Sequence, residues 1–187
     1  MEILITLGVL GLLAFIVIGI YNRLVALRQN CENAFADIDV QLKQRRDLIP
    51  NLVNTVQGYA GHEEKVLQSV TEARAAAMAG GSLEKQMAAE AQVSRALFDL
   101  KAVAEAYPDL KADENFQKLQ DELSDIENKI AAARRFFNNA TAEFNTAVEV
   151  FPAVLFAASF GFHKREFFEL PEDSRAEYDK PPEVSFS

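Results

Sequence analysis

The stretch FQKLQDELSDIENKIAAARRFFNNATAEFNTAVEVF, residues 116–151, has the most regular hydrophobic pattern in the chain. Its apolar and small residues recur in alternating steps of three and four, which is the spacing of one face of a helix. A period of about 3.5 residues kept over about five heptads is typical of helices packed as in a coiled coil. We therefore predict a long helix over 113–151. Its stripe comprises Phe116, Leu119, Leu123, Ile126, Ile130, Ala133, Phe137, Ala140, Phe144, Ala147 and Phe151.

The same spacing predicts three further helices upstream, over residues 22–60, 62–79 and 82–107. Gly80 and Gly81 separate the second from the third, and Ser82 can cap the third. Pro108 ends the third helix, and residues 109–115 are expected to form a turn. The expected stripes are Leu24, Leu27, Cys31, Ala34, Ile38, Leu42, Arg45, Ile49, Leu52, Val56 and Tyr59 in the first helix, Val66, Val70, Ala73 and Ala77 in the second, and Leu83, Met87, Ala91, Leu97, Leu100, Ala104 and Tyr107 in the third.

The N-terminal residues 3–21 carry no charged side chain and predict a membrane anchor. As a helix they would span about 28 Å, close to the thickness of a bilayer core. The run leads straight into Arg23 without a small-residue cleavage site, which favours a retained anchor over a cleaved signal peptide. Arg23 and Arg28 follow it and no basic residue precedes it. The positive-inside rule therefore places the N-terminus outside and the rest of the chain in the cytoplasm.

The fold class predicted from these patterns is all-α. A single-pass transmembrane helix at 3–21 continues into a long antiparallel bundle of about four helices over 22–151, with heptad-like packing. An aromatic amphipathic segment follows at 152–169. Residues 170–187 form a polar, acidic C-terminal tail.

The stretch RRDLIPNLV, residues 45–53, interrupts the first bundle helix with charges and a proline. The apolar stripe stays in phase across Pro50, so we predict a kinked helix that continues rather than ends. Arg45 occupies a stripe position. It is expected to pair with an acid of the last helix or to reach water with its stem. Asp47 is expected to satisfy a freed backbone amide or to face solvent.

Five phenylalanines and a basic cluster mark the segment that follows Pro152. If the long helices are antiparallel, this segment returns to the membrane end of the bundle. Two readings stay open: contact with lipid or another subunit, and folding back onto its own bundle. Arg23 and Arg28 could join its basic residues in a patch for lipid phosphates. The candidate contact residues are Phe156, Phe160, Phe162, Lys164, Arg165, Phe167 and Phe168.

Composition and spacing argue against several classes of function. A net charge of −9 and a pI near 4.8 disfavour nucleic-acid binding. The single cysteine, Cys31, falls on the apolar stripe, and His62 and His163 lack the spacing of metal ligands. The sequence contains no phosphate-binding loop or nucleophile motif. We therefore expect no catalytic residues, no cofactor and no metal, and we do not expect an enzyme.

Four blocks of the sequence together cover most of the chain: YNRLVALRQN (21–30), IDVQLKQRRDLIPNLVNTVQGYAGHE (38–63), AEAYPDLKADENFQKLQDELSDIENKIAAARRFFNNATAEFNTAVEVFP (104–152) and GFHKREFFE (161–169). These blocks resemble the LemA family of bacterial membrane proteins. Phe35 stands where the family usually has tryptophan, so an aromatic residue is kept. The resemblance implies a membrane-anchored helical bundle in the bacterial cytoplasmic (inner) membrane and supplies no catalytic mechanism.

The family also includes a magnetosome-biogenesis protein, and its members are associated with the membrane metalloprotease HtpX. Two functions follow as expectations. The first is a self-assembling, homo-oligomeric scaffold on the lipid bilayer, motivated by the anchor and the long amphipathic helices. The second is an adaptor or regulator of a membrane protease such as HtpX, acting through the tail at 173–187. A sensor is a weaker third reading, because the sequence has no recognisable ligand pocket or output domain.

Overall fold

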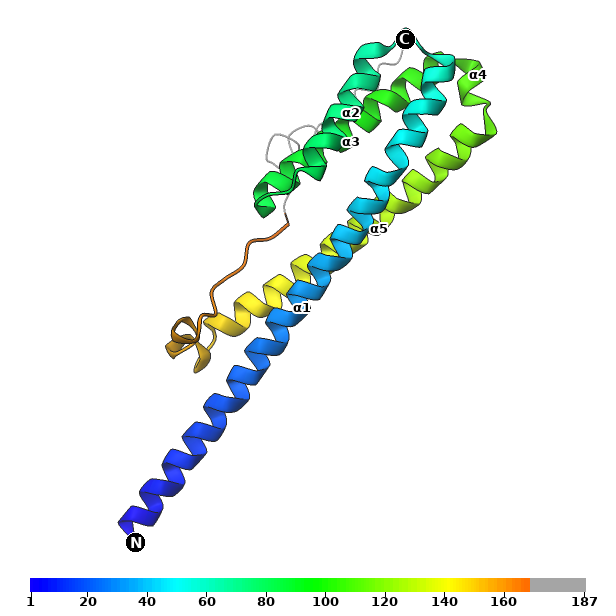
Figure 1. Ribbon diagram of the computed structural model, residues 1–187. Coiled ribbons are helices and arrows are strands. Elements are labelled where there is room, and N and C mark those ends of the chain that lie inside the picture. Colours follow the sequence, from blue (N-terminus) through cyan, green and yellow to red (C-terminus); the bar gives the residue numbers. More distant parts are fainter. Residues whose placement is uncertain (169–187) are drawn as a thin grey trace, which may run out of the picture. The chain divides into compact units, whose positions relative to one another are not determined.

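The computed structural model describes residues 1–168, and every regular element in that range is helical (Figure 1). The all-α class and the long apolar N-terminal helix are therefore confirmed, whereas the predicted tail at 170–187 lies outside the described residues. The elements are α1 (Glu2–Tyr59), α2 (Glu64–Met78), α3 (Leu83–Ala106), α4 (Pro108–Lys111), α5 (Glu114–Glu149) and the 3-10 turns η1 (Ala153–Leu155) and η2 (Ala158–Phe160).

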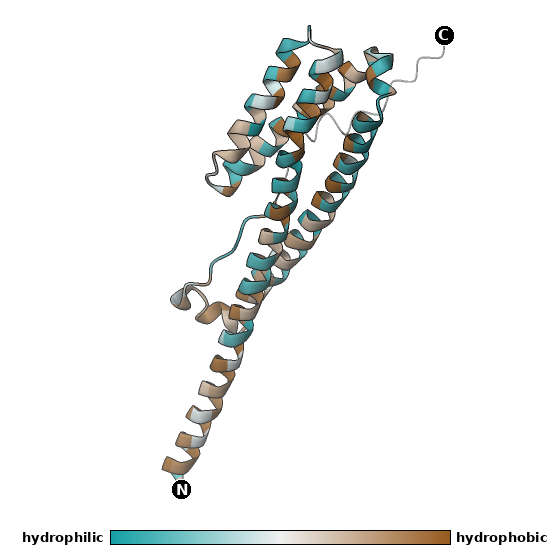
Figure 2. Cartoon of the chain, turned by 45° about the vertical axis from the view of Figure 1, so that its right-hand side comes forward, coloured by the Kyte–Doolittle hydropathy of each residue, from teal (hydrophilic) through white to brown (hydrophobic). Residues whose placement is uncertain are grey.

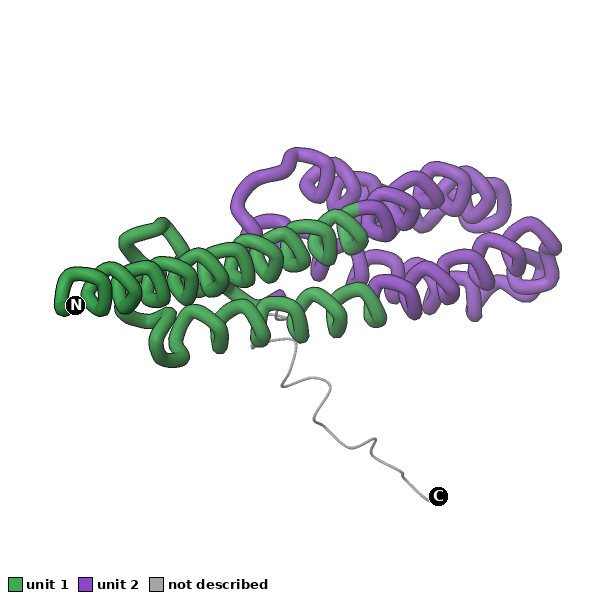
Figure 3. Tube along the Cα trace, turned by 90° about the horizontal axis from the view of Figure 1, so that it is seen from below, with its two compact units in different colours: residues 1–39, 131–167 green, residues 40–130, 168–187 purple. Residues whose placement is uncertain are grey.

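The chain divides into two compact units, which Figure 3 distinguishes by colour. Unit 1 comprises residues 1–39 and 131–167, and unit 2 comprises residues 40–130 and 168–187. Helices α1 and α5 each contribute to both units.

The N-terminal part of α1 presents apolar side chains to its surroundings and is almost continuously hydrophobic (Figure 2). Within residues 1–168, α1 is the one helix long and apolar enough to cross a membrane, and its most apolar window is not buried in the protein. An exposed apolar face of this size is stable in lipid and costly in water. The segment therefore fits a membrane anchor.

Pro50 lies inside α1, and the helix continues through it to Tyr59. The neighbouring stripe residues Ile49, Leu52 and Val56 are all buried. Because proline has no backbone N–H, the helix lacks one hydrogen bond at Pro50. The burial of three neighbouring stripe residues contributes more to stability than this lost hydrogen bond. The predicted continuation is thus confirmed, whereas the kink at Pro50 stays a prediction.

In unit 2, α2 and α3 form a helical hairpin joined by residues 79–82. Gly80 and Gly81 have φ of +69° and +137°, which side chains disfavour, so glycine suits this reversal. Ser82 caps α3 by accepting a hydrogen bond from the amide of Lys85 at 3.4 Å. The core of unit 2 includes Ile49, Leu52, Val56, Leu67, Val70, Val93, Leu97, Leu100, Leu110, Phe116 and Leu123.

The sequence prediction was wrong about the turn at 109–115. Residues 108–111 instead form the short helix α4, because Pro108 at its first position has a pre-set helical φ and needs no amide partner. Leu110 is fully buried, which fixes α4 to the core.

The predicted stripe of α3 was also wrong in its first half. Glu90, Val93 and Ala96 are buried there, rather than Leu83, Met87 and Ala91. A pattern read from apolar residues alone passes over a buried carboxylate at Glu90, and so it selected the neighbouring face.

Candidate functional site

Two groups of side-chain contacts stand out in the described residues, one in each unit. The charge cluster of unit 2 consists of Arg45, Arg46, Glu90, Ser94 and Glu127. The aromatic clasp of unit 1 consists of Tyr21, Arg28, Phe144, Asn145, Phe160, Phe162 and Arg165. Within residues 1–168, no three His, Cys, Asp or Glu side chains are grouped so that they could hold a metal ion.

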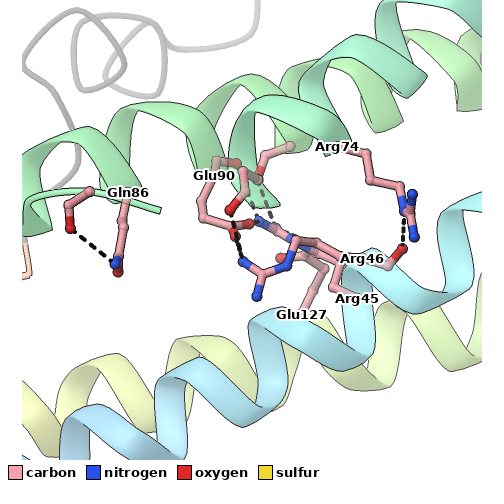
Figure 4. Close-up of polar contacts among 9 residues, drawn as sticks. Arg45, Arg46, Arg74, Gln86, Glu90 and Glu127 are labelled. Carbon is pink, nitrogen blue, oxygen red and sulfur yellow. Dashed lines mark hydrogen bonds and ion pairs between the residues drawn. The ribbon is translucent and has the colours of Figure 1, made fainter. Parts of the chain in front are cut away.

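Arg45 is the centre of the charge cluster, with 2% of its surface exposed. Its Nη2 donates to Oε2 of Glu90 at 2.5 Å and to the backbone oxygen of Glu90 at 3.2 Å. Its Nη1 donates to Oε1 of Glu127 at 2.7 Å and to Oγ of Ser94 at 2.9 Å. Figure 4 shows Arg45 reaching from α1 to Glu90 on α3 and to Glu127 on α5. Arg45 therefore joins three helices through one guanidinium group.

Glu90 is buried and accepts from two arginines at once. Its other oxygen, Oε1, accepts from Nη1 of Arg46 at 2.6 Å, so each carboxylate oxygen faces a guanidinium (Figure 4). Arg74 of α2 donates from Nε to the backbone oxygen of Arg46 at 2.9 Å. A buried charge is tolerated only where opposite charges and hydrogen bonds replace water, and Glu90 meets this condition.

The charge cluster balances two guanidinium groups against two carboxylates. Its strongest bonds are internal, and both oxygens of Glu90 are engaged by Arg45 and Arg46. A general acid or base needs a carboxylate that can exchange a proton with a substrate. The geometry instead suits a structural role, in which directional bonds fix how α1, α3 and α5 align within unit 2.

Asp47, the third charge in RRDLIPNLV, lies outside the cluster. It is exposed and accepts a hydrogen bond from Nζ of Lys43, one helical turn earlier, at 2.7 Å. That hydrogen bond lowers the pKa of Asp47 below its usual value. Of the two alternatives for Asp47, the structure shows the solvent-facing one.

The aromatic clasp is built around Phe162, which is 2% exposed. Its ring meets that of Tyr21 on α1 edge to face, with 5.5 Å between centroids, and that of Phe144 on α5 at 6.5 Å. The guanidinium carbon of Arg28 lies 5.2 Å from the Phe162 centroid, within the range of a cation–π contact. Phe162 thus attaches the segment after α5 to both long helices within unit 1.

Polar contacts secure the same segment. Asn145 pairs with the backbone of Arg165: its Nδ2 donates to the carbonyl at 2.9 Å, and its Oδ1 accepts from the amide at 2.8 Å. Nζ of Lys164 lies 2.5 Å from Oε1 of Glu149, and Nη1 of Arg165 lies 3.8 Å from Oε1 of Glu32. These contacts hold the basic residues beside α1 and α5 of unit 1.

The structure separates the predicted contact residues into two sets. Phe162 and Phe168 are buried, and Phe156 is partly buried. Phe160, Lys164 and Phe167 are exposed, and Arg165 is partly buried. Phe162 therefore folds back onto its own bundle, whereas Phe160 stays exposed. The stripe predicted for the helix over 113–151 was wrong at its last position, because α5 ends at Glu149 and Phe151 beyond it is 78% exposed. Sequence reasoning did not select Val154 and Leu155, which are exposed apolar residues of the segment that follows.

Comparison with known proteins gives consistent matches. The LemA family model matches residues 34–186. Protein LemA of Metamycoplasma hominis is 25% identical over 172 residues, covering 91% of this chain and 78% of that protein. Magnetosome protein MamQ of Magnetospirillum gryphiswaldense is 24% identical over 195 residues, covering 89% and 72%. Magnetosome protein MamQ 2 of Paramagnetospirillum magneticum is 23% identical over 194 residues, covering 89% and 71%. The chain belongs to the LemA family.

Proposed function

We propose that this chain is a non-catalytic, membrane-anchored helical scaffold that self-assembles in the membrane. The observation that carries the proposal is the N-terminal part of α1, which exposes apolar side chains over most of residues 3–21. A Cβ atom added to Gly8, Gly11 or Gly19 would meet no other atom within 4 Å, so this face of the helix is open. Small residues at such spacing let two membrane helices approach closely.

The remainder of the described chain supports a scaffold rather than an enzyme. The charge cluster ties Arg45, Glu90 and Glu127 together inside unit 2 and serves to hold helices. Long helices cross-linked by such contacts suit a rigid support that is held at the membrane by its anchor.

We place the protein in the bacterial cytoplasmic membrane with its N-terminus outside. Arg23 and Arg28 follow the apolar stretch and are exposed, whereas Glu2 precedes it. Basic residues are retained on the cytoplasmic side of a membrane helix, which supports this orientation. The LemA-family membership supports a bacterial membrane but carries no information about orientation.

Self-assembly is tested by measuring the mass of the full chain in mild detergent, with in-cell crosslinking as a second readout. We expect a defined oligomer for the natural sequence and a strong shift toward monomer for the double variant Gly8→Leu and Gly11→Leu. Leu13→Phe is the matched control, since it adds bulk on roughly the opposite side of the helix at about 100° per residue.

A strict monomer at high protein concentration would contradict the scaffold proposal. A crosslinked complex that holds one copy of this chain and one copy of a membrane protease would favour the adaptor reading instead. An oligomer that survives the glycine substitutions would retain self-assembly and move the contact away from this face of α1.

A further inference from the structure

The segment after α5 presents a small apolar surface, which we name the apolar collar. It consists of Phe151, Val154, Leu155 and Phe160, with Phe151 and Leu155 78% and 72% exposed. Single exposed apolar side chains are ordinary, but four within ten residues form a patch that water covers poorly.

The collar contacts the end of the membrane anchor through Phe160. The ring of Phe160 meets the ring of Tyr21 edge to face, with 5.3 Å between centroids. Tyr21 is the last residue of the uncharged stretch 3–21, and the first charge, Arg23, follows two residues later. Both aromatic residues are thus at the end of the span, where Tyr and Trp gather in membrane proteins.

The outward direction of the collar is fixed by the packing beneath it. Ala153 and Ala157 are buried against the core of unit 1, together with Phe162. Within η1, Val154 and Leu155 consequently face away from that core and are exposed. The hydrogen bonds between Asn145 and the Arg165 backbone hold the segment at its C-terminal end.

The backbone of the collar is largely satisfied by bonds within the segment. The amides of residues 154–157 and 160–162 all donate to carbonyls between residues 150 and 158. Backbone groups that enter a lipid environment must be paired internally, because no water is present to replace their bonds. This pairing suits a segment that enters the membrane interface.

We propose that the apolar collar inserts into the lipid interface beside the anchor, so that its four side chains pack among lipid chains and fix the depth of unit 1. The proposal rests on the membrane anchoring within the proposed function and adds a second membrane contact to it. The partner is a lipid surface, chosen over a second copy of the chain because the collar contacts the end of the lipid-exposed span.

The chain contains no tryptophan, so one introduced tryptophan is an unambiguous fluorescent reporter. The test places the full chain in phosphatidylcholine vesicles with and without brominated lipid. Leu155→Trp reports on the collar, and Phe160→Trp repeats the measurement with an aromatic residue kept in place. We expect blue-shifted emission that brominated lipid quenches by severalfold and that acrylamide barely affects.

Two matched variants make the result interpretable. Phe98→Trp lies on α3, is 71% exposed, and should be quenched by acrylamide and not by brominated lipid. Phe15→Trp lies in the anchor and should be quenched by brominated lipid whether or not the collar inserts. If Phe15→Trp is quenched by lipid and the collar variants are not, the collar proposal fails while the anchor stands.

Two further outcomes also overturn the inference. Blue-shifted emission from Leu155→Trp without quenching by brominated lipid would show that protein, such as a second copy, covers the collar. Emission quenched by acrylamide as strongly as in Phe98→Trp would show that water covers it. If Phe15→Trp also escapes lipid quenching, the anchoring on which both proposals rest fails with it.

Discussion

The charge cluster of unit 2 and the aromatic clasp of unit 1 hold helices together by opposite means. Arg45 and Phe162 are each only 2% exposed, and each joins α1 to α5 within its own unit. Arg45 does so through bonds of 2.5 to 2.9 Å to charged and polar atoms on two other helices. Phe162 does so through ring contacts with centroid distances of 5.5 and 6.5 Å.

The difference lies in how each contact responds to change. Ring contacts tolerate small shifts of the helices, because dispersion and hydrophobic burial have little direction. The hydrogen bonds of Arg45 break if a helix slides by one turn, and the buried charge is then left without a partner. Unit 2 therefore has one specified alignment, whereas the segment after α5 is held mainly by burial.

The largest effect is expected from removing the carboxylate of the charge cluster. In Glu90→Leu, Arg45 keeps Glu127, whose side chain is 42% exposed, Ser94 and the backbone oxygen of residue 90. Breaking a buried pair from one side costs about 3–5 kcal/mol, because a charge remains in the interior. Denaturant unfolding of the full chain in detergent, followed by helical circular dichroism, measures the loss.

The double variant Arg45→Met with Glu90→Leu provides the control. It removes both buried charges and leaves Arg46 and Glu127, which have access to water. We expect most of the lost stability to return, as apolar replacements of buried ion pairs often do. Lys43→Ala breaks an exposed pair and should change the midpoint far less. An unchanged midpoint for Glu90→Leu would contradict a stabilising cluster.

A smaller and more local effect is expected from Phe162→Ala. The change removes a buried ring between Tyr21 and Phe144, and such a change costs about 3 kcal/mol where the surroundings can partly collapse. Hydrogen exchange should speed up at the amides of residues 154–162, while α2 and α3 keep their protection. Phe98→Ala, at an exposed position, is the matched control. Loss of protection in α2 as well would show that the clasp is not local to unit 1.

The third prediction concerns Asn145→Ala, which removes two hydrogen bonds to the backbone of Arg165. The expected cost is about 1–2 kcal/mol, since neutral hydrogen bonds contribute about 1 kcal/mol each. Faster exchange of the Arg165 amide is the direct readout. Asn139→Ala, exposed on the same helix, should leave that amide unchanged. Equal exchange in both variants would mean that the hydrogen bonds of Asn145 do not hold the segment.

The features that could be predicted from the sequence differ from those that could not. The stripe of α1 was predicted correctly from Leu24 to Val56, including the charged position at Arg45, because a helix keeps its period through one odd residue. The prediction was wrong at its last position, since Tyr59 is 46% exposed. The anchor at 3–21 could be predicted equally well, because it depends on composition alone. Both predictions rest on residues that are close together in the sequence.

The structural roles of Glu90 and Phe162 were harder to predict, because they depend on partners far away in the sequence. Glu90 reads as a solvated residue until Arg45 and Arg46 are placed beside it. The signal that could have found it is the charge at Arg45 itself, since a buried arginine on one stripe requires an acid on another. Phe162 was selected as a contact residue, but only the structure shows that its ring faces Tyr21 and Phe144 rather than lipid.

The smallest predicted effect concerns an exposed polar contact in unit 2, which contrasts with the buried charge cluster. Asp113 precedes α5, and its Oδ1 accepts from the amide of Phe116 at 2.8 Å while its Oδ2 accepts from the hydroxyl of Tyr59 at 3.0 Å. The hydrogen bond from the Phe116 amide and then that from Tyr59 lower the pKa of Asp113 below its ordinary value of 3.8.

Since the folded-state pKa of Asp113 is the lower one, its contribution to stability is complete above pH 3.8 and is lost as the pH falls through the folded value. Asp113→Asn keeps an oxygen acceptor for Phe116 but cannot ionise, so unfolding midpoints should depend less on pH below 3.8 than in the natural chain. Asp121→Asn makes the same charge change at an exposed position of α5 and serves as control. The unfolding midpoints of both variants could depend on pH in the same way as those of the natural chain. In that case the cap of α5 does not depend on the charge of Asp113, and directional charge contacts that stabilise unit 2 are confined to its interior.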